Sequence, residues 1–267
     1  FDADAEGLRE ALCTLGNGIF ATRGAVAESG SGPHYPATYP AGIYNRLTSE
    51  VDGHTEAHES LVNAPNWLPL THRPPGGHWF DLDDVEILSY EQPLDLNDAV
   101  LHRVVRYRDG DGRITLLREE RLVSMAETRF AAIRQVIEPE NWSGDITVRS
   151  SIDGTVTNSG TIENRKLANR HLTVVDHGAA EGSSHDAVNA WVTAETVQSH
   201  VRVAVATRTT VTGTPPGASG APRLLHQAHA AGSEVDVPAA PGEPVTVEKV
   251  AALCTAREPA VSEPAEA

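Results

Sequence analysis

The stretch LHRVVRYRDGDGRITLLREERLV, from Leu101 to Val123, gives the strongest indication of the fold class. It contains two strand-like runs joined by Asp109-Gly110-Asp111-Gly112. Aspartate and glycine tolerate the positive φ angles that a tight turn requires. The stretch therefore predicts a β-hairpin.

Strand-like patterns continue on both sides of this hairpin. In HVRVAVATRTTV (200–211) all four valines share one parity and both arginines the other, which is the two-residue period of a strand buried on one face. GDITVRSSIDG (144–154) repeats the pattern. Five further runs resemble strands: GIFATRG, WLPLTHR, VEILSY, RFAAIRQVI and VTVEKVAAL.

Helical patterns are nearly missing from the sequence. Only the segment from Asp2 to Leu12 predicts a short helix, with Leu8 and Leu12 one turn apart and acidic residues at its start. Short strands separated by turn signals, without alternating helices, predict an all-β fold, either an antiparallel sandwich or a barrel.

Composition excludes several classes of function. The 267 residues carry a net charge of −16, which repels the phosphates of nucleic acids and anionic lipids. We therefore expect no nucleic-acid partner and no membrane partner, and no apolar run approaches the ~20 residues of a membrane span. The two cysteines, Cys13 and Cys254, form no disulfide framework, and the N-terminus lacks the features of a signal peptide. These features indicate a cytoplasmic protein.

Domain organisation is expected to be simple. Residues 1–256 are predicted to form one β-sandwich domain. Residues 257–267, REPAVSEPAEA, are rich in Pro, Glu and Ala and predict the start of a linker.

Short catalytic motifs do not assign a reaction. The sequence contains no G-x-S-x-G, P-loop, G-x-G-x-x-G or H-E-x-x-H pattern. His54 and His58 are four residues apart, as metal ligands on a helix would be, but a solvated loop is the favoured interpretation. Arg23, in GNGIFATRG, is expected to form an internal salt bridge rather than an anion site. We predict no metal site and no cofactor.

The tryptophans allow two interpretations. Trp67 and Trp79 could stack on sugar rings, because a pyranose has an apolar face. Core packing is favoured for both, since the chain is poor in Phe. Trp142 is expected to fill a corner of a sheet. Carboxylates are abundant, and nothing in the sequence selects a pair for glycoside chemistry.

HYPATYPAGIYNRL (34–47) holds three of the five tyrosines. Together with ALCTLGNGIFATRGA, LVNAPNWLPL, WFDLDDVEILSYEQPLDL, RLVSMAE and PENWSGDITVRSSIDGTVTN, it resembles the N-terminal domain of glycoside hydrolase family 65. This family includes maltose, kojibiose, nigerose and trehalose phosphorylases and acid trehalases. The resemblance extends from about Gly7 to Glu258.

The resemblance implies a large antiparallel β-sandwich, a super-sandwich like that of galactose mutarotases. It also implies a following barrel of paired helices with the active site, where a Glu protonates the glycosidic oxygen and inorganic phosphate or water attacks with inversion. No residue of this chain matches that Glu, so no catalytic residue is assigned and the domain alone is expected to be inactive. The implied role is a scaffold for the barrel and a surface for a homodimer. The implied substrates are α-glucose disaccharides.

For residues 34–47 we rank structural packing first, a loop at the rim of the active site second, and an independent sugar platform last. The candidate substrate-binding residues are His34, Tyr35, Tyr39 and Trp67. One rival is a carbohydrate-binding module with Trp67 or Trp79 exposed. Another is a mutarotase-like enzyme, for which His34 or His102 would be the acid.

Overall fold

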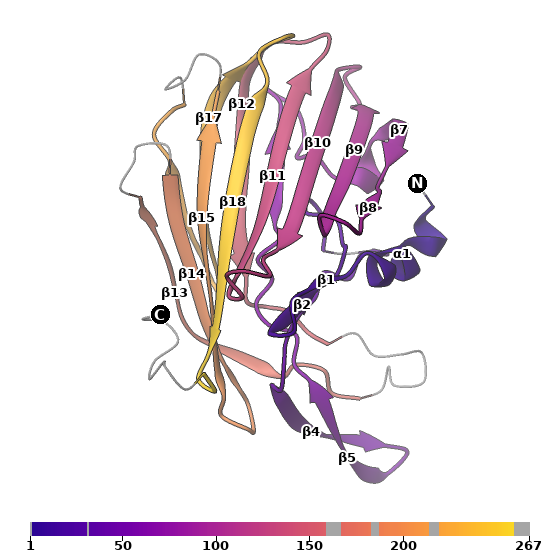
Figure 1. The fold of residues 1–267 in the computed structure, drawn as a ribbon, viewed down its shortest axis with the longest axis vertical. Coiled ribbons are helices and arrows are strands. Elements are labelled where there is room, and N and C mark those ends of the chain that lie inside the picture. The colour runs from indigo at the N-terminus through magenta and orange to yellow at the C-terminus, as the bar shows by residue number, and fades with distance from the viewer. Residues whose placement is uncertain (1, 31, 159–166, 183–186, 214–218, 259–267) are drawn as a thin grey trace.

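The computed structural model describes residues 2–30, 32–158, 167–182, 187–213 and 219–258. Two antiparallel sheets pack against each other, and a smaller N-terminal part lies beside one end of them (Figure 1). None of the described helices is long and apolar enough to cross a membrane. Residues 259–267 of the predicted linker lie outside the described residues, so that boundary stays a prediction.

The larger sheet has nine strands in the order β13-β14-β15-β18-β11-β10-β9-β7, with β8 also paired to β9. Its strands are β7 (Glu86–Glu91), β8 (Leu94–Asp95), β9 (Val100–Arg108), β10 (Ile114–Val123), β11 (Phe130–Pro139), β13 (Leu172–Glu181), β14 (Ala187–Thr196), β15 (Arg202–Thr212) and β18 (Val245–Thr255).

The smaller sheet has four strands in the order β16-β17-β12-β6. They are β6 (Leu70–Arg73), β12 (Gly144–Asp153), β16 (Arg223–Gln227) and β17 (Ala230–Ala239). Strands β12 and β17 contact β14 and β15 of the larger sheet, so the core lies between the two sheets. The expected antiparallel β-sandwich is confirmed.

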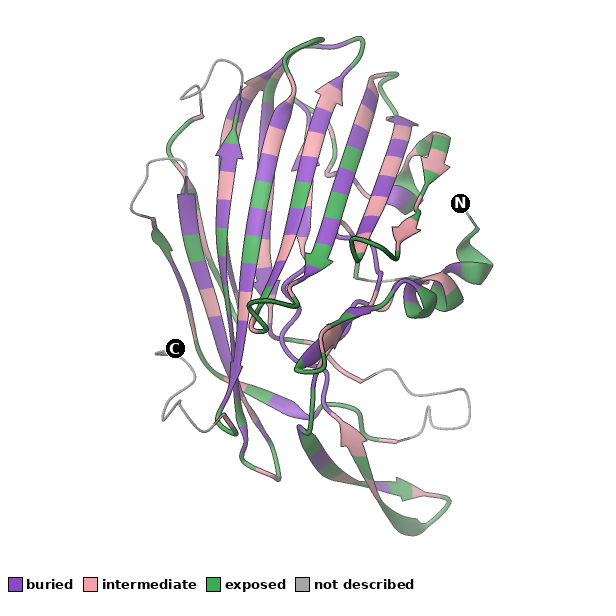
Figure 2. Ribbon diagram, viewed as in Figure 1, coloured by how far each residue is buried: buried purple, intermediate pink, exposed green. Residues whose placement is uncertain are grey.

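The predicted hairpin joins β9 to β10. The amide N of Gly112 donates to the carbonyl O of Asp109 at 3.0 Å, and Gly112 has a φ of 82°. Buried and exposed residues alternate along β10, β11 and β18, as Figure 2 shows. The alternation of β15 is also confirmed, since its valines are buried.

The N-terminal part contains a short helix, as expected. It comprises η1 (Ala3–Ala5), α1 (Glu6–Leu12), a small sheet of β1 (Leu15–Gly16), β2 (Phe20–Thr22) and β3 (Thr38–Pro40), and a ribbon of β4 (Tyr44–Val51) and β5 (His54–Leu61). A further short helix, η2 (Leu82–Asp84), precedes β7. Leu8 and Leu12 point outward and are 65% and 70% exposed, whereas Glu6 and Glu10 of the same helix are buried.

His54 and His58 lie on a strand rather than in a loop, so that part of the sequence interpretation was wrong. Residues four apart on a strand are separated by about 13 Å, so the two rings are not paired as they would be on a helix. Cys13 and Cys254 are both buried and free. Trp142 is buried and its Nε1 donates to Thr115 Oγ1 at 3.0 Å, in agreement with its predicted packing role.

Candidate functional site

Two of the three tyrosines of residues 34–47 lie together. The hydroxyl oxygens of Tyr35 and Tyr39 are 2.8 Å apart, and both side chains are half-buried. Burial and the bond from Tyr35 raise the pKa of Tyr39 above its ordinary value. Tyr44 lies at the start of β4 and is 46% exposed. The stretch therefore forms a packed tyrosine pair and a separate exposed ring.

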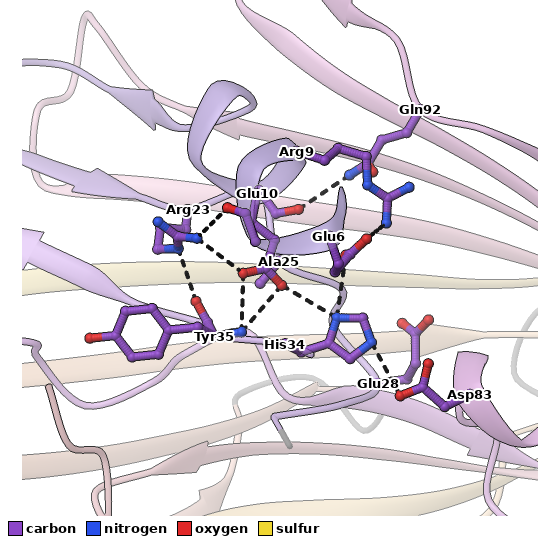
Figure 3. A network of polar contacts seen from close by, with 12 residues as sticks. Glu6, Arg9, Glu10, Arg23, Ala25, Glu28, His34, Tyr35, Asp83 and Gln92 are labelled. Carbon is purple, nitrogen blue, oxygen red and sulfur yellow. Dashed lines mark hydrogen bonds and ion pairs between the residues drawn. The ribbon is translucent and has the colours of Figure 1, made fainter. Parts of the chain in front are cut away.

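His34 is buried beneath α1, where three carboxylates surround its ring (Figure 3). Its Nδ1 lies 3.3 Å from Glu6 Oε1 and 3.3 Å from Glu10 Oε1. On the other side, its Nε2 lies 3.6 Å from Asp83 Oδ2 of η2. Because Glu6 and Glu10 are one helical turn apart, both reach the same ring.

Two arginines complete this cluster. Arg9 pairs with Glu6, and its guanidinium lies over the ring of Tyr90 at 4.7 Å. Arg23 pairs with Glu10 at 3.3 Å and donates to the carbonyl O of Tyr35 at 3.1 Å. The internal salt bridge expected for Arg23 is thus confirmed. Together these contacts fasten α1 to the start of the tyrosine-rich stretch.

The electrostatics of the cluster favour a protonated His34. Burial alone would lower the pKa of His34, but hydrogen bonds and charge from Glu10 and Glu6 outweigh it and raise that pKa to about 10. For Glu6, burial opposes the effect of His34 and Arg9, and the net result is a lowered pKa. A protonated imidazole paired with two carboxylates is an ion pair rather than a general acid matched to neutral pH.

The same three side chains have the donor set of a metal site. Ligand atoms of Glu6, Glu10 and His34 all lie within 4.8 Å of one another. However, the carboxylates already contact two arginines, and a protonated imidazole has no lone pair to offer a metal. The arrangement therefore favours a structural ion-pair cluster over a metal centre.

The remaining candidates are not brought to His34. Trp67 is 1% exposed and belongs to the core. His102 lies on β9, with its Nδ1 3.8 Å from Glu120 Oε1 at the surface. A small cavity of about 190 Å³ does adjoin Tyr35, but its amides Asn63 and Asn66 are bonded to backbone groups of the protein.

A larger cavity of about 510 Å³ lies between the loop that follows β6 and the β9–β10 turn. Trp79 forms part of its wall, and the guanidinium groups of Arg73 and Arg149 lie 4.7 Å and 3.8 Å from the centre of that ring. The apolar and aromatic part of the lining also includes Pro74, Phe80, Val85 and Tyr107. The polar part consists of His78 and three aspartates, Asp84, Asp109 and Asp111. Such a lining suits a small polar molecule that has an apolar face.

The loops around this cavity are fixed to each other. Arg113 donates to Asp109 Oδ2 at 2.9 Å and to the carbonyl O of Pro75 at 2.9 Å, which joins the hairpin turn to the loop. Sequence reasoning favoured core packing for Trp79, and that interpretation was wrong, because the side chain is only partly buried and lies outside the core. Sequence reasoning also missed the neighbours of Trp79 in this cavity. They come from residues 74–85 and 107–111, and no local pattern links these two segments.

Comparison with known proteins gives the family. The family model described as glycosyl hydrolase family 65, N-terminal domain, matches residues 1–267. The chain belongs to this family. The resemblance found in the sequence is therefore confirmed.

Relatives within family 65 include enzymes with named substrates. The chain is 41% identical over 261 residues to an uncharacterized glycosyl hydrolase of Mycobacterium tuberculosis (strain H37Rv), which covers 97% of this chain and 19% of the relative. It is 37% identical over 169 residues to kojibiose phosphorylase of Caldanaerobacter subterraneus subsp. tengcongensis (63% and 20%). It is 28% identical over 217 residues to α,α-trehalose phosphorylase of Thermoanaerobacter brockii (77% and 27%). The chain spans about a fifth to a quarter of the length of these curated relatives.

A solved structure supports the fold. The chain superposes with a TM-score of 0.77 on a protein described as "Putative kojibiose phosphorylase from human microbiome", covering 96% of this chain and 31% of that one. Sequence identity is 16%, so this likeness concerns the fold alone.

Proposed function

We propose that this family 65 chain is the N-terminal accessory domain of an inverting disaccharide phosphorylase. The observation that carries the proposal is the family match over residues 1–267, together with relatives named kojibiose phosphorylase and trehalose phosphorylase. The substrates would be an α-glucose disaccharide and inorganic phosphate. The full-length protein would be a cytoplasmic homodimer, and a related α-glucoside hydrolase is the alternative.

In this proposal the catalytic acid belongs to the part of the protein that follows the sandwich. The candidate side chains of the sandwich support this placement of the catalytic acid, because they are already paired or packed inside the domain. His34 is paired with Glu6 and Glu10, Tyr35 with Tyr39, and Trp67 lies in the core. These groups stabilise the domain, and its role would be to support the catalytic barrel and the dimer.

The proposal is tested with the full-length protein beside residues 1–267. Glucose and glucose 1-phosphate are measured after incubation with maltose, kojibiose, nigerose and trehalose, with and without phosphate. We expect glucose 1-phosphate only from the full-length protein and only with phosphate. Activity without phosphate would support the hydrolase, whereas activity of residues 1–267 alone would refute the accessory role.

The cavity beside Trp79 favours carbohydrate binding as a second candidate function. Aromatic rings contact the apolar face of a sugar, and aspartates accept hydrogen bonds from its hydroxyl groups. Calorimetric titration of residues 1–267 with glucose and the four disaccharides would measure this binding. Trp79→Ala should abolish it, while Trp191→Phe, on β14, should not. No detectable heat with any of these sugars would exclude this function.

A further inference from the structure

The outer face of the nine-stranded sheet, which is turned away from the smaller sheet, carries paired charges over β9, β10 and β11. The arginines of these strands lie beside carboxylates: Arg106 beside Glu140, Arg118 beside Glu138, and Arg134 beside Glu120 and Glu248. A strip across β14, β15, β18 and β11 differs, because it has no charged residue. These four strands lie side by side in the sheet (Figure 1).

Five residues form this strip, which we name the aromatic row. In the register of the strands, each member is directly opposite the next: Gly178 and Trp191, Trp191 and Ala206, Ala206 and Ala252, Ala252 and Phe130. Directly opposite residues of an antiparallel pair project from the same face of the sheet. Ala206 is exposed and Phe130 is 41% exposed, so the row faces solvent.

Trp191 lies flat over the glycine at the end of the row. A Cβ atom built on Gly178 would be 2.5 Å from Cζ2, 2.8 Å from Cη2 and 3.0 Å from Cε2 of the indole. The Nε1 of Trp191 donates to Asp176 Oδ2 at 2.8 Å. The indole is therefore a fixed plate with one ring face against the sheet and the other towards solvent. An aromatic ring presented in this way stacks on the apolar face of a pyranose.

The size of the row decides which kind of sugar fits. Ala206 and Ala252 form a flat floor between the two aromatic residues, since neither has a side chain beyond Cβ. Trp191 and Phe130 are three strand spacings apart, which is about 14 Å. A single pyranose on Trp191 does not reach Phe130, whereas a linear chain of sugars contacts both rings. The row therefore suits an oligosaccharide.

Hydrogen-bond donors for such a chain lie beside the row. Asn189 of β14 and Arg208 of β15 are directly opposite each other, two residues along their strands from Trp191 and Ala206. Both are exposed, and neither side chain has a partner in the part of the chain that the structure describes. Amide and guanidinium groups donate hydrogen bonds to hydroxyl oxygens. An aromatic plate, a flat floor and free donors together supply the contacts that a sugar chain uses.

We propose that the aromatic row binds a neutral linear oligosaccharide, with one pyranose on Trp191 and another on Phe130. Charge favours this ligand over a second copy of the chain, because two copies that each carry −16 repel each other and a neutral sugar chain is not repelled. The alanine floor also lacks a pocket for an anchoring side chain of a protein partner. The proposal goes beyond the phosphorylase function and does not depend on it.

Nuclear magnetic resonance of the tryptophan indole N–H groups tests the proposal in residues 1–267. Maltoheptaose and cellohexaose, which differ in the linkage between glucose units, are titrated separately. We expect at least one of them to shift the Trp191 signal, which is assigned by its loss in Trp191→Phe. Glucose should shift this signal much less, because it contacts only one of the two rings.

Three results of this titration would overturn the proposal. The first is that neither oligosaccharide shifts the Trp191 signal. The second is a shift confined to the Trp79 signal, which would assign the sugar to the cavity beside that residue. The third is a Trp191 signal that moves with protein concentration in the absence of sugar, which would assign the row to a second copy of the chain.

Calorimetric titration of variants with the oligosaccharide that binds adds a second measurement. Trp191→Ala should weaken binding roughly tenfold, because it removes the stacking plate. Ala206→Gln adds a longer side chain to the exposed floor and removes no core contact, so it should weaken binding and leave the melting temperature unchanged. Leu96→Ala, at an exposed apolar site that follows β8, is the matched control and should bind as the wild type does. Wild-type affinity in Trp191→Ala or in Ala206→Gln would overturn the proposal.

Discussion

At the scale of single residues, buried charges tie the nine-stranded sheet to the segment that follows β2. Arg103 of β9 pairs with Glu28 at 2.6 Å and with Glu119 of β10 at 3.0 Å. Glu119 also accepts from Arg121 at 2.8 Å and from Gln135 at 2.7 Å. Burial would raise the pKa of Glu119, but the charges of Arg103 and Arg121 outweigh it and lower that pKa to about 2.

We predict that Glu119→Gln destabilises residues 1–267 by about 3–5 kcal/mol at pH 7, because it leaves buried arginines without a counter-charge. Urea unfolding measures this loss. Glu138→Gln, which breaks the partly exposed pair with Arg118, should cost only about 0–1 kcal/mol.

The pH dependence of stability follows from the same carboxylate. Because the pKa of Glu119 is depressed in the folded protein, its stabilisation is present above the unfolded value of about 4.3 and fades as pH falls towards 2. Equal losses of unfolding free energy in Glu119→Gln and Glu138→Gln would contradict the stabilising role of the buried Glu119.

His34 should make stability depend on pH in the opposite sense. Its pKa of about 10 in the folded protein exceeds the ordinary value of 6.5, so its stabilisation is complete below pH 6.5 and is lost as pH rises through 10. The difference in unfolding free energy between the wild type and His34→Gln should therefore shrink across this window. His226→Gln, at an exposed site on β16, should follow the wild type. A constant difference for His34→Gln would show that the ring is neutral.

At the scale of elements, the β9–β10 hairpin depends on one of its two turn glycines. Gly112 has a φ of 82°, a conformation that is unfavourable for residues with a Cβ atom, whereas Gly110 has no such angle. No atom lies within 4 Å of a Cβ built on either glycine, so only backbone conformation distinguishes them.

We predict that Gly112→Ala costs about 1–2 kcal/mol, while Gly110→Ala changes stability by less than about 0.5 kcal/mol. Thermal unfolding of the two variants in parallel measures the difference. Similar losses would mean that the turn adopts another conformation in solution.

At the scale of the whole molecule, Lys249 joins the two sheets. It projects from β18, and its Nζ donates to the carbonyl O of Pro69 at 3.0 Å and of Ser151 on β12 at 2.8 Å. The side chain is fully buried, and this burial lowers its pKa well below the ordinary value. The sandwich therefore contains a buried amine that is bonded to carbonyl groups in its core.

We predict that the stability of the wild type relative to Lys249→Met rises with pH up to the ordinary lysine value of about 10.4. The reason is that the unfolded chain binds a proton at this site more tightly than the folded protein does. Denaturant unfolding of both proteins between pH 7 and 10 measures the slope. A flat or falling difference would show that Lys249 keeps its proton without penalty in the core.

The sequence by itself determined the fold class, the main hairpin and the family. These depend on local features: the two-residue alternation of strands such as β15, the turn residues 109–112, and long contiguous motifs such as residues 34–47. Glu6 and Glu10 are four residues apart, a spacing that lets both contact one partner from a helix. Leu8 and Leu12 have the same spacing, so the sequence did not show which of the two pairs faces the interior. Only the tertiary structure decided which face of α1 is buried, that Trp67 lies in the core, and that residues 74–85 and 107–111 form one cavity. Such outcomes depend on which distant segments meet, and the free energy of those contacts is absent from any local pattern.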